Sequence, residues 1–244
     1  MPGERRQIYG RRLGPRLRPG RRRLLEERLP EVELGLPAEP GRRIDVDRLF
    51  PDGGPRPPFR LEIGFGGGEH LAGQAAAHPG VGFIGCEPYI GGVARLLALA
   101  EERRLDNIRV VVDDARLLLR ALPDACLERV FVLFPDPWPK RRHRKRRLIS
   151  PATAAEIARL LAPGGELRLA TDDMDYARAI LAACRGEPRL RWLARRPRDW
   201  RERPPDAPPT RYEAKALAAG RPRVYLRFAR RPAAPGSTEF VENP

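Results

Sequence analysis

The turn after the apolar run 130–134 carries side chains that could act on a nucleic-acid base. That run is typical of a strand buried on both faces of a parallel sheet. Three prolines at alternate positions follow it directly and end the strand, because proline cannot donate to a sheet ladder and restricts the residue before it. Asp136 and Trp138 are therefore predicted on a stiff turn at the carboxyl end of a strand, where open α/β sheets bind ligands. A tight surface turn without chemistry is the alternative interpretation.

A cationic run, residues 140–147, continues this turn with seven fixed positive charges and one histidine. Beside a carboxylate and an aromatic ring, the run suggests binding to nucleic-acid phosphates, although a solvated start of a basic helix has the same composition. The whole chain has a net charge of +15 and a pI near 11.0, which favours a polyanionic partner. Residues 1–23 are rich in arginine and glycine and lack periodic apolar positions, which predicts a flexible basic arm.

An acid and three glycines accompany a second short apolar run. Glu62, Gly64, Gly66 and Gly68 stand at alternate positions, so the spacing differs from the G-x-G-x-x-G fingerprint of dinucleotide-binding proteins. Glycines here let the backbone approach a ligand closely and turn into a helix. An acid two residues before the first glycine suits a cationic ligand better than phosphates. The sulfonium and amino groups of S-adenosylmethionine are such a ligand.

Two further acids follow the next two predicted strands. Glu87 could accept hydrogen bonds from both hydroxyls of a ribose. Asp114 could meet an adenine ring together with Ala115. Each acid taken alone could be a helix N-cap. With Glu62 and Asp136 included, four successive strands end in an acid, which makes a coincidence of caps the weaker interpretation.

Strand and helix patterns alternate between residues 59 and 231, and the strands are continuously apolar. This alternation predicts an α/β fold with a doubly wound, mainly parallel, Rossmann-like sheet. The predicted division is a basic N-terminal arm and loop over 1–58, the sheet domain over 59–231 and a polar tail over 232–244. The expected elements are strands at 61–63, 81–86, 108–112, 130–134, 166–170, near 192 and at 224–228, helices at 69–77, 91–104, 115–122, 151–161 and 175–185, a helical turn at 24–29, and a loop at 197–210.

Five segments together resemble the bacterial tRNA (guanine-N7)-methyltransferases, which are class I S-adenosylmethionine-dependent enzymes acting on a guanine in the tRNA variable loop. The resemblance covers about residues 60–230, and its motifs occur in the family's order. The segments are Leu61-Glu62-Ile63-Gly64-Phe65-Gly66 with Gly68-Glu69; Gly85-Cys86-Glu87; Phe134-Pro135-Asp136-Pro137-Trp138-Pro139-Lys140 with His143 and Lys145-Arg146-Arg147; Ala170-Thr171-Asp172; and Thr210-Arg211-Tyr212-Glu213.

The resemblance implies roles for individual residues, with Asp136 as the catalytic residue. The residues expected to bind S-adenosylmethionine are Glu62, Gly64, Gly66, Gly68, Glu87, Asp114 and Asp136. The residues expected to bind the tRNA guanosine are Lys140, Asp172, Thr210, Arg211, Tyr212 and Glu213. This chain departs mildly from the family in the late motif, where Arg211 and Tyr212 replace the usual lysine and phenylalanine, and at His70, where an apolar residue is common.

The chemistry of guanine N7 decides what these carboxylates are expected to do. N7 carries an in-plane lone pair and no proton, so methyl transfer to it requires no general base. We expect the site to align the reacting atoms and Asp136 to stabilise the cationic purine. Asp172 and Glu213 could accept hydrogen bonds from N1–H and the 2-amino group, which would reject adenine.

Three other functions fit parts of the sequence. An amino-methyltransferase acting on another RNA or DNA base would have an Asp/Asn-Pro-Pro-aromatic turn, whereas a single proline separates Asp136 from Trp138 here. An RNA-binding module without a cofactor is disfavoured by the glycines and the strand-end acids. A nicotinamide-dependent dehydrogenase is disfavoured by the glycine spacing and the basic run.

The three cysteines form no CxxC pair and the three histidines lack metal-ligand spacing, so no metal site is predicted. No apolar run approaches the roughly 20 residues of a membrane span. The amino terminus lacks the apolar core of a secretory signal. We therefore expect a cytoplasmic protein with tRNA as its partner, and the sequence leaves open whether it is a monomer or a homodimer.

Overall fold

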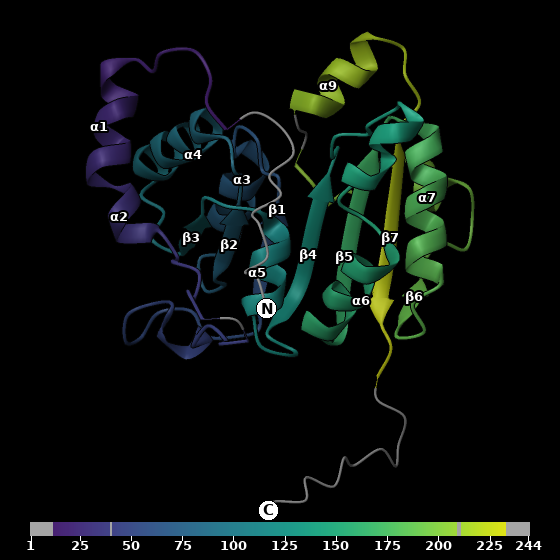
Figure 1. Cartoon of the computed structure of the whole chain (residues 1–244), viewed down its shortest axis with the longest axis horizontal. Coiled ribbons are helices and arrows are strands. Elements are labelled where there is room, and N and C mark those ends of the chain that lie inside the picture. The colour runs from purple at the N-terminus through teal and green to yellow at the C-terminus, as the bar shows by residue number, and fades with distance from the viewer. Residues whose placement is uncertain (1–11, 40, 209–210, 233–244) are drawn as a thin grey trace, which may run out of the picture.

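The computed structural model describes residues 12–39, 41–208 and 211–232. Its centre is a seven-stranded sheet with the strand order β3-β2-β1-β4-β5-β7-β6 (Figure 1). The strands are β1 (Phe59–Ile63), β2 (Phe83–Cys86), β3 (Ile108–Val111), β4 (Leu127–Leu133), β5 (Leu161–Thr171), β6 (Leu190–Trp192) and β7 (Val224–Arg230).

The predicted α/β fold with a mainly parallel sheet is confirmed. β1 pairs in parallel with β2 and β4, β2 with β3, and β4 with β5. β7 runs antiparallel between β5 and β6. The strand order reverses between β1 and β4, and the carboxyl ends of neighbouring strands on both sides of this point lie at one edge. In doubly wound sheets ligands bind at that place.

Helices cover both faces of the sheet, and each layer has its own core. Leu118 of α5, Ile157 of α6 and Ile180 of α7 belong to one buried cluster with the sheet. Leu71 of α3 and Leu96 of α4 belong to a second cluster. The bounds are α3 (Glu69–Ala77), α4 (Ile90–Arg103), α5 (Ala115–Ala121), α6 (Pro151–Leu160) and α7 (Met174–Arg185), all within one residue of those predicted.

The N-terminal segment is more ordered than its composition predicts. Residues 19–23 were expected in the flexible arm, but they form the first half of α1 (Pro19–Glu27), and α2 (Leu29–Val32) follows. Pro19 suits the first helical position, because a backbone N–H there would have no acceptor within the helix and its absence in proline costs nothing. Leu24 is 3% exposed and packs in the cluster of α3 and α4, which fixes α1 beside α4 (Figure 1). The expected arm over 1–11 lies outside the described residues.

Two helices lie where a proline-rich loop and a short motif were expected. α8 (Arg198–Arg201) interrupts the predicted loop 197–210, and α9 (Arg211–Ala218) begins within the late motif. Two 3-10 helices complete the described elements, η1 (Val46–Arg48) and η2 (Arg141–Arg146). Residues 233–244 of the expected tail lie outside the described residues. The domain boundaries at 58/59 and 231/232 stay predictions.

Candidate active site

A pocket of about 490 Å³ lies at the carboxyl ends of β1, β2, β3 and β4. Its volume and position match those of small-molecule sites in α/β folds. The predicted site residues that line it are Gly64, Gly66, Glu87, Asp114, Asp136 and Tyr212, and Trp138 lines it as well.

The glycine-rich loop after β1 lines this pocket through Gly64 and Gly66, but not through Gly68. Gly64, Gly66 and Gly68 have φ angles of +71°, +56° and +79°, a conformation that side chains strongly disfavour. A Cβ atom on Gly66 would lie 3.0 Å from a ring carbon of Tyr212. A Cβ atom on Gly92 of α4 would lie 2.1 Å from the carbonyl oxygen of Gly66. The loop is therefore held between two close neighbours, one of them on α9.

Glu87 follows β2 and is pinned by backbone donors. Its Oε2 accepts a hydrogen bond from the N–H of Gly66 (2.8 Å), and its Oε1 accepts one from the N–H of Tyr89 (3.0 Å). Burial raises the pKa of Glu87, while those two N–H groups oppose the shift and the charges of Asp136 and Glu62 add to it. Each carboxylate oxygen keeps a further lone pair for a ligand hydroxyl.

Asp114 combines the two functions that the sequence left open. It is the N-cap of α5, because its Oδ1 accepts a hydrogen bond from the N–H of Arg116 (2.8 Å). It also lines the pocket beside Ala115, and the guanidinium of Arg116 lies 3.4 Å from its carboxylate. Capping therefore fixes the side chain at the pocket wall, where a ligand can still contact it.

Glu62 lies next to the main pocket in a smaller cavity of about 20 Å³, which Gly64 and Tyr212 also line. Its side chain is 4% exposed, and its Oε2 lies 2.7 Å from Nδ1 of His70 in the first turn of α3. The strand order β3-β2-β1-β4 places the four predicted acids along one edge in the order Asp114, Glu87, Glu62 and Asp136.

The turn after β4 is as stiff as the prolines predict. Phe134 and Trp138 have φ angles of +51° and +44°, which cost energy in residues other than glycine and are enriched at functional sites. The N–H of Phe134 donates to the carbonyl of Ala170 on β5 (2.8 Å), and Nε of Arg147 donates to the carbonyl of Pro137 (2.7 Å). Asp136 is exposed at the pocket rim between these two anchors.

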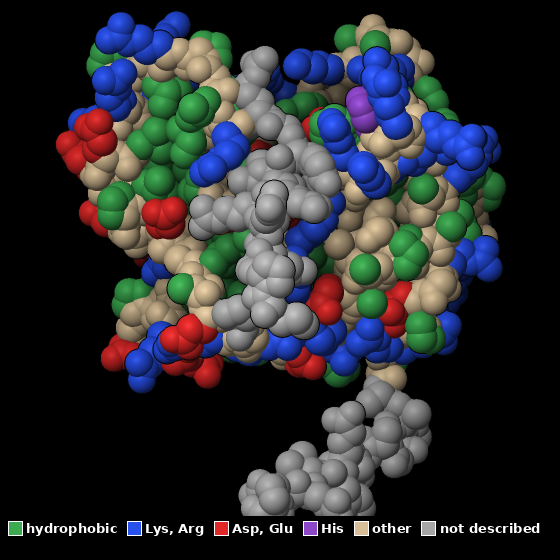
Figure 2. Space-filling view, viewed as in Figure 1, with side chains coloured by type: hydrophobic (Ala, Val, Ile, Leu, Met, Phe, Trp, Pro, Cys, Tyr) green, Lys and Arg blue, Asp and Glu red, His purple; other side chains and the backbone are tan. Residues whose placement is uncertain are grey.

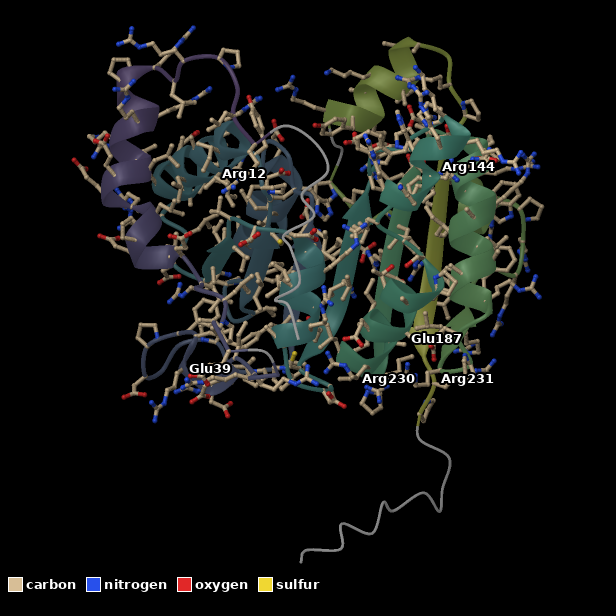
Figure 3. The ribbon with its side chains drawn as sticks, in the orientation of Figure 1. Arg12, Glu39, Arg144, Glu187, Arg230 and Arg231 are labelled. Carbon is tan, nitrogen blue, oxygen red and sulfur yellow. The ribbon has the colours of Figure 1, made fainter. Side chains whose placement is uncertain are left out.

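The basic run divides into structural and exposed members. Arg147 is 8% exposed, and its Nη2 also forms an ion pair with Asp175 (2.6 Å), so the expectation that the whole run contacts phosphates is wrong for this residue. The guanidinium of Arg146 lies 4.9 Å from the ring centre of Trp138. Arg144 lies beside α7 (Figure 3), 3.1 Å from Asp175.

The exposed cations of this run form one surface. They are Lys140, Arg141, Arg142, Arg144 and Lys145. Figure 2 shows lysine and arginine side chains gathered on the side of α7 and η2, around a histidine. This surface adjoins the turn that carries Asp136, so a polyanion bound to the cations would reach the pocket rim.

The late motif places two side chains in opposite directions from the start of α9. Tyr212 is half-exposed and lines both cavities, and burial raises the pKa of its hydroxyl. Glu213 is 6% exposed and accepts a hydrogen bond from the hydroxyl of Tyr225 (2.5 Å), with Nε of Arg203 at 3.3 Å. Arg211 is exposed and lines the small cavity beside Glu62. Thr210 lies outside the described residues.

Asp172 and Lys140 lie apart from the main pocket. Asp172 follows β5 directly, and its Oδ2 forms an ion pair with Arg221 (2.8 Å), which stands between α9 and β7. Lys140 is the exposed N-cap residue of η2. The predicted cofactor-binding side chains therefore converge, whereas the predicted guanosine-binding side chains surround them on β5, η2 and α9.

Sequence reasoning missed two residues that hold this site together. His70 bonds Glu62, and its departure from the family's apolar pattern was the available signal. Arg147 anchors the turn, and nothing in a run of like charges distinguishes it. Among the described residues no helix is long and apolar enough to cross a membrane.

The carboxylates and the glycine backbone of the pocket suit S-adenosylmethionine. Within the described parts of the chain, Glu87 and Asp136 have no ion-pair partner, and Glu62 is bonded only by a histidine. Unpaired carboxylates around a concave site favour a ligand that carries positive charge and hydroxyl groups. The loop of positive-φ glycines allows the ligand to lie against the backbone.

Comparisons with known proteins identify the family to which this chain belongs. A family model described as "Putative methyltransferase" matches residues 56–226. The tRNA (guanine-N(7)-)-methyltransferase of Rhodospirillum rubrum is 54% identical over 244 residues, which cover 100% of this chain and 95% of the relative. Proteins of the same name from Nitrobacter hamburgensis and Chelativorans sp. are 47% and 45% identical over 91% of this chain, covering 86% and 94% of the relatives. A solved structure of the aminoglycoside resistance methyltransferase NpmB1 is 18% identical, with a TM-score of 0.49 over 72% of this chain and 88% of that one. The chain belongs to the family of bacterial tRNA (guanine-N7)-methyltransferases.

Proposed function

We propose that this chain transfers the methyl group of S-adenosylmethionine to N7 of a guanine in the variable loop of tRNA. The observation that carries the proposal is the row of four acids at the ends of β3, β2, β1 and β4, beside an exposed cationic surface. The names of the relatives support tRNA and guanine N7 as the target. Action on tRNA places the activity in the cytoplasm.

Each cofactor-side residue would hold a different part of S-adenosylmethionine. Glu87 is fixed to accept hydrogen bonds from the ribose hydroxyls, and Asp114 with Ala115 bounds the adenine side of the pocket. Glu62 lies where the amino group of the methionine part would enter the small cavity. Gly64 and Gly66 let the ligand approach the backbone. When bound, the cofactor supplies an electrophilic methyl carbon.

Asp136 acts on the purine by position and charge. The turn that carries it is held at Phe134 and at Pro137, so the backbone of Asp136 has little freedom to move when the guanine arrives. N7 has no proton to lose, and the purine becomes cationic as its lone pair is used. A fixed carboxylate beside the ring stabilises that positive charge, and alignment of the reacting atoms supplies the rest of the rate.

The RNA is bound by the exposed cations of η2 and by groups around α9. Lys140 and Lys145 contact phosphates, which makes the affinity for tRNA strongly dependent on salt. Asp172 accepts hydrogen bonds from the N1–H and 2-amino group of guanine. Glu213 faces inward, so in this proposal it fixes α9 and thereby holds Tyr212 over the glycine loop.

The test is incubation with S-adenosylmethionine labelled in its methyl group and bulk tRNA, followed by mapping of alkali-labile methylated guanines. We expect label at N7 of one variable-loop guanine. Label on an exocyclic amine would instead establish an amino-methyltransferase, and unlabelled tRNA would exclude both activities. Asp136→Asn should slow single-turnover transfer by about 10-fold to 1,000-fold and also weaken cofactor binding, because the carboxylate lines the cofactor pocket. Asp124→Asn, on the exposed partner of Arg159 away from the pocket, is the matched control.

A further inference from the structure

A buried pair formed by His70 and Glu62 lies behind the small cavity. The two side chains are 3% and 4% exposed, and Nδ1 of His70 lies 2.7 Å from Oε2 of Glu62. The histidine ring packs edge-on against Phe131 of β4, with ring centres 4.8 Å apart and an interplanar angle of 70°. Packing and a hydrogen bond thus fix the ring, and the ring fixes one oxygen of the carboxylate.

The other ring nitrogen shows which protonation state this pair has. Nε2 of His70 is buried and has no hydrogen-bond partner among the described residues. A protonated imidazole would bury an N–H group there without an acceptor, which costs more than a bare lone pair does. A second cavity that His70 lines also has Arg168, Arg203 and Arg227 among its lining residues, each of them ion-paired, and Glu213 is the one carboxylate among the lining residues. His70 is therefore neutral, and its Nδ1–H donates to Glu62.

A neutral histidine leaves the pair with one negative charge. A cationic imidazole would neutralise Glu62 and remove its attraction for a positive ligand. An apolar side chain at position 70 would leave a buried carboxylate oxygen without a donor and free to rotate. The pair keeps the negative charge of Glu62 at the small cavity, which both residues line together with Gly64 and Tyr212.

We propose that His70 is a positioning residue that, as the neutral Nδ1–H tautomer, holds Glu62 for the amino group of the methionine part of S-adenosylmethionine. This inference rests on the proposed function, because it takes that cofactor as the ligand of the pocket. It adds a residue that never contacts the reacting atoms but decides how strongly one end of the cofactor is bound.

Comparing two ligands distinguishes the contribution of the methionine end to binding from that of the nucleoside end. S-adenosylmethionine reaches both Glu62 and Glu87, whereas 5′-methylthioadenosine has no amino-acid part and reaches only the nucleoside side. By calorimetric titration, His70→Leu should weaken S-adenosylmethionine binding about tenfold, the loss of one hydrogen bond to a charged group. Binding of 5′-methylthioadenosine should stay within about twofold. His70→Asn should restore the affinity, because its side-chain amide can donate from the place of Nδ1.

His78→Asn is the matched control, since His78 is the C-cap of the same helix and lies outside the pocket. If the wild-type protein binds neither ligand, the result refutes the proposed function itself, and not specifically the role of His70. If both ligands bind and His70→Leu weakens them equally or not at all, the inference is overturned. Equal weakening by His70→Asn and His70→Leu would also overturn it.

The tautomer can be read without any cofactor. Nitrogen-15 NMR of the ligand-free protein distinguishes an imidazole protonated at Nδ1, at Nε2 or at both, and with three histidines in the chain the His78→Asn spectrum simplifies assignment. We expect the Nδ1–H form for His70 near neutral pH. A doubly protonated ring, or the Nε2–H form, would refute the inference even if a leucine variant failed to fold.

Discussion

Arg147 ends the basic run, yet its contacts predict a structural function. The residue is 8% exposed, its Nε donates to the carbonyl of Pro137 (2.7 Å), and its guanidinium lies 4.8 Å from the ring centre of Tyr176. Replacement by methionine keeps most of the apolar stem and removes the donor. We expect Arg147→Met to destabilise the fold and loosen the turn that carries Asp136.

The hydrogen bond to Pro137 sets the size of the expected loss of stability in Arg147→Met. A hydrogen bond from a charged donor contributes about 1.5–3 kcal/mol. The ion pair with Asp175 adds nothing to this figure, because that carboxylate is exposed and screened by solvent. A loss of about 2 kcal/mol lowers the melting temperature by roughly 4–8 °C in a domain of this size. The rate of methyl transfer should fall as well, because Asp136 loses its fixed position.

Thermal unfolding and salt-dependent tRNA binding together test this reasoning. Lys145→Met, on an exposed member of the same run, is the matched control. It should leave the melting temperature unchanged and reduce the slope of log K against log salt by about 0.7–0.9, the share of one phosphate contact. Arg147→Met should instead lower the melting temperature and leave the salt slope unchanged. An Arg147→Met protein that melts at the wild-type temperature and binds tRNA with a reduced salt slope would refute the structural function.

Three further predictions concern the pocket itself. Gly92→Ala should abolish cofactor binding, because its Cβ would lie 2.1 Å from the carbonyl oxygen of Gly66. Gly73→Ala is the control, because its Cβ would meet only a proline ring at 3.5 Å. This control should raise the free energy of unfolding in urea by about 0.5–1 kcal/mol. Because burial raises the pKa of Glu87, acidification should protonate it at a higher pH than an ordinary glutamate and weaken cofactor binding there, and a Glu87→Gln protein should show a weaker but flat pH profile in calorimetry. Tyr212→Ala should weaken cofactor binding about tenfold by uncovering the glycine loop, and Tyr212→Phe should not, since the ring rather than the hydroxyl covers Gly66.

The sequence was sufficient to predict that the strand-end acids lie together, for a geometric reason. Carboxyl ends of parallel strands meet at one edge, so an acid after each strand must lie near the others once the strand order is known. The alternate glycines after β1 were expected to let the backbone approach a ligand and turn into a helix, and the structure adds that Gly64, Gly66 and Gly68 all have positive φ angles. Local signals and topology agree there, and the predicted positions of Glu87 and Asp114 hold in the structure.

The sequence was insufficient where the decisive contact joins distant or chemically identical residues. Arg146 and Arg147 are neighbours of the same type, but one lies over Trp138 and the other is buried against Pro137. Only the second half of α1 was predicted, as a helical turn at 24–29, because arginines dominate the first half and one leucine, Leu24, supplies the buried contact with α4. Packing partners outside the local window decide both cases.

The two carboxylates predicted to hydrogen-bond the guanine, Asp172 and Glu213, differ in how easily a substrate could replace their present partners. Asp172 is paired with Arg221, whose side chain is 54% exposed, and an exposed ion pair contributes about 0–1 kcal/mol. Glu213 is buried with Tyr225, and breaking a buried bond to a charged group costs about 1.5–3 kcal/mol. An incoming guanine can offer Asp172 two donors in exchange for one weak ion pair. Reaching Glu213 would require disruption of the base of α9, so under the proposed function Asp172 rather than Glu213 is expected to distinguish guanine from adenine.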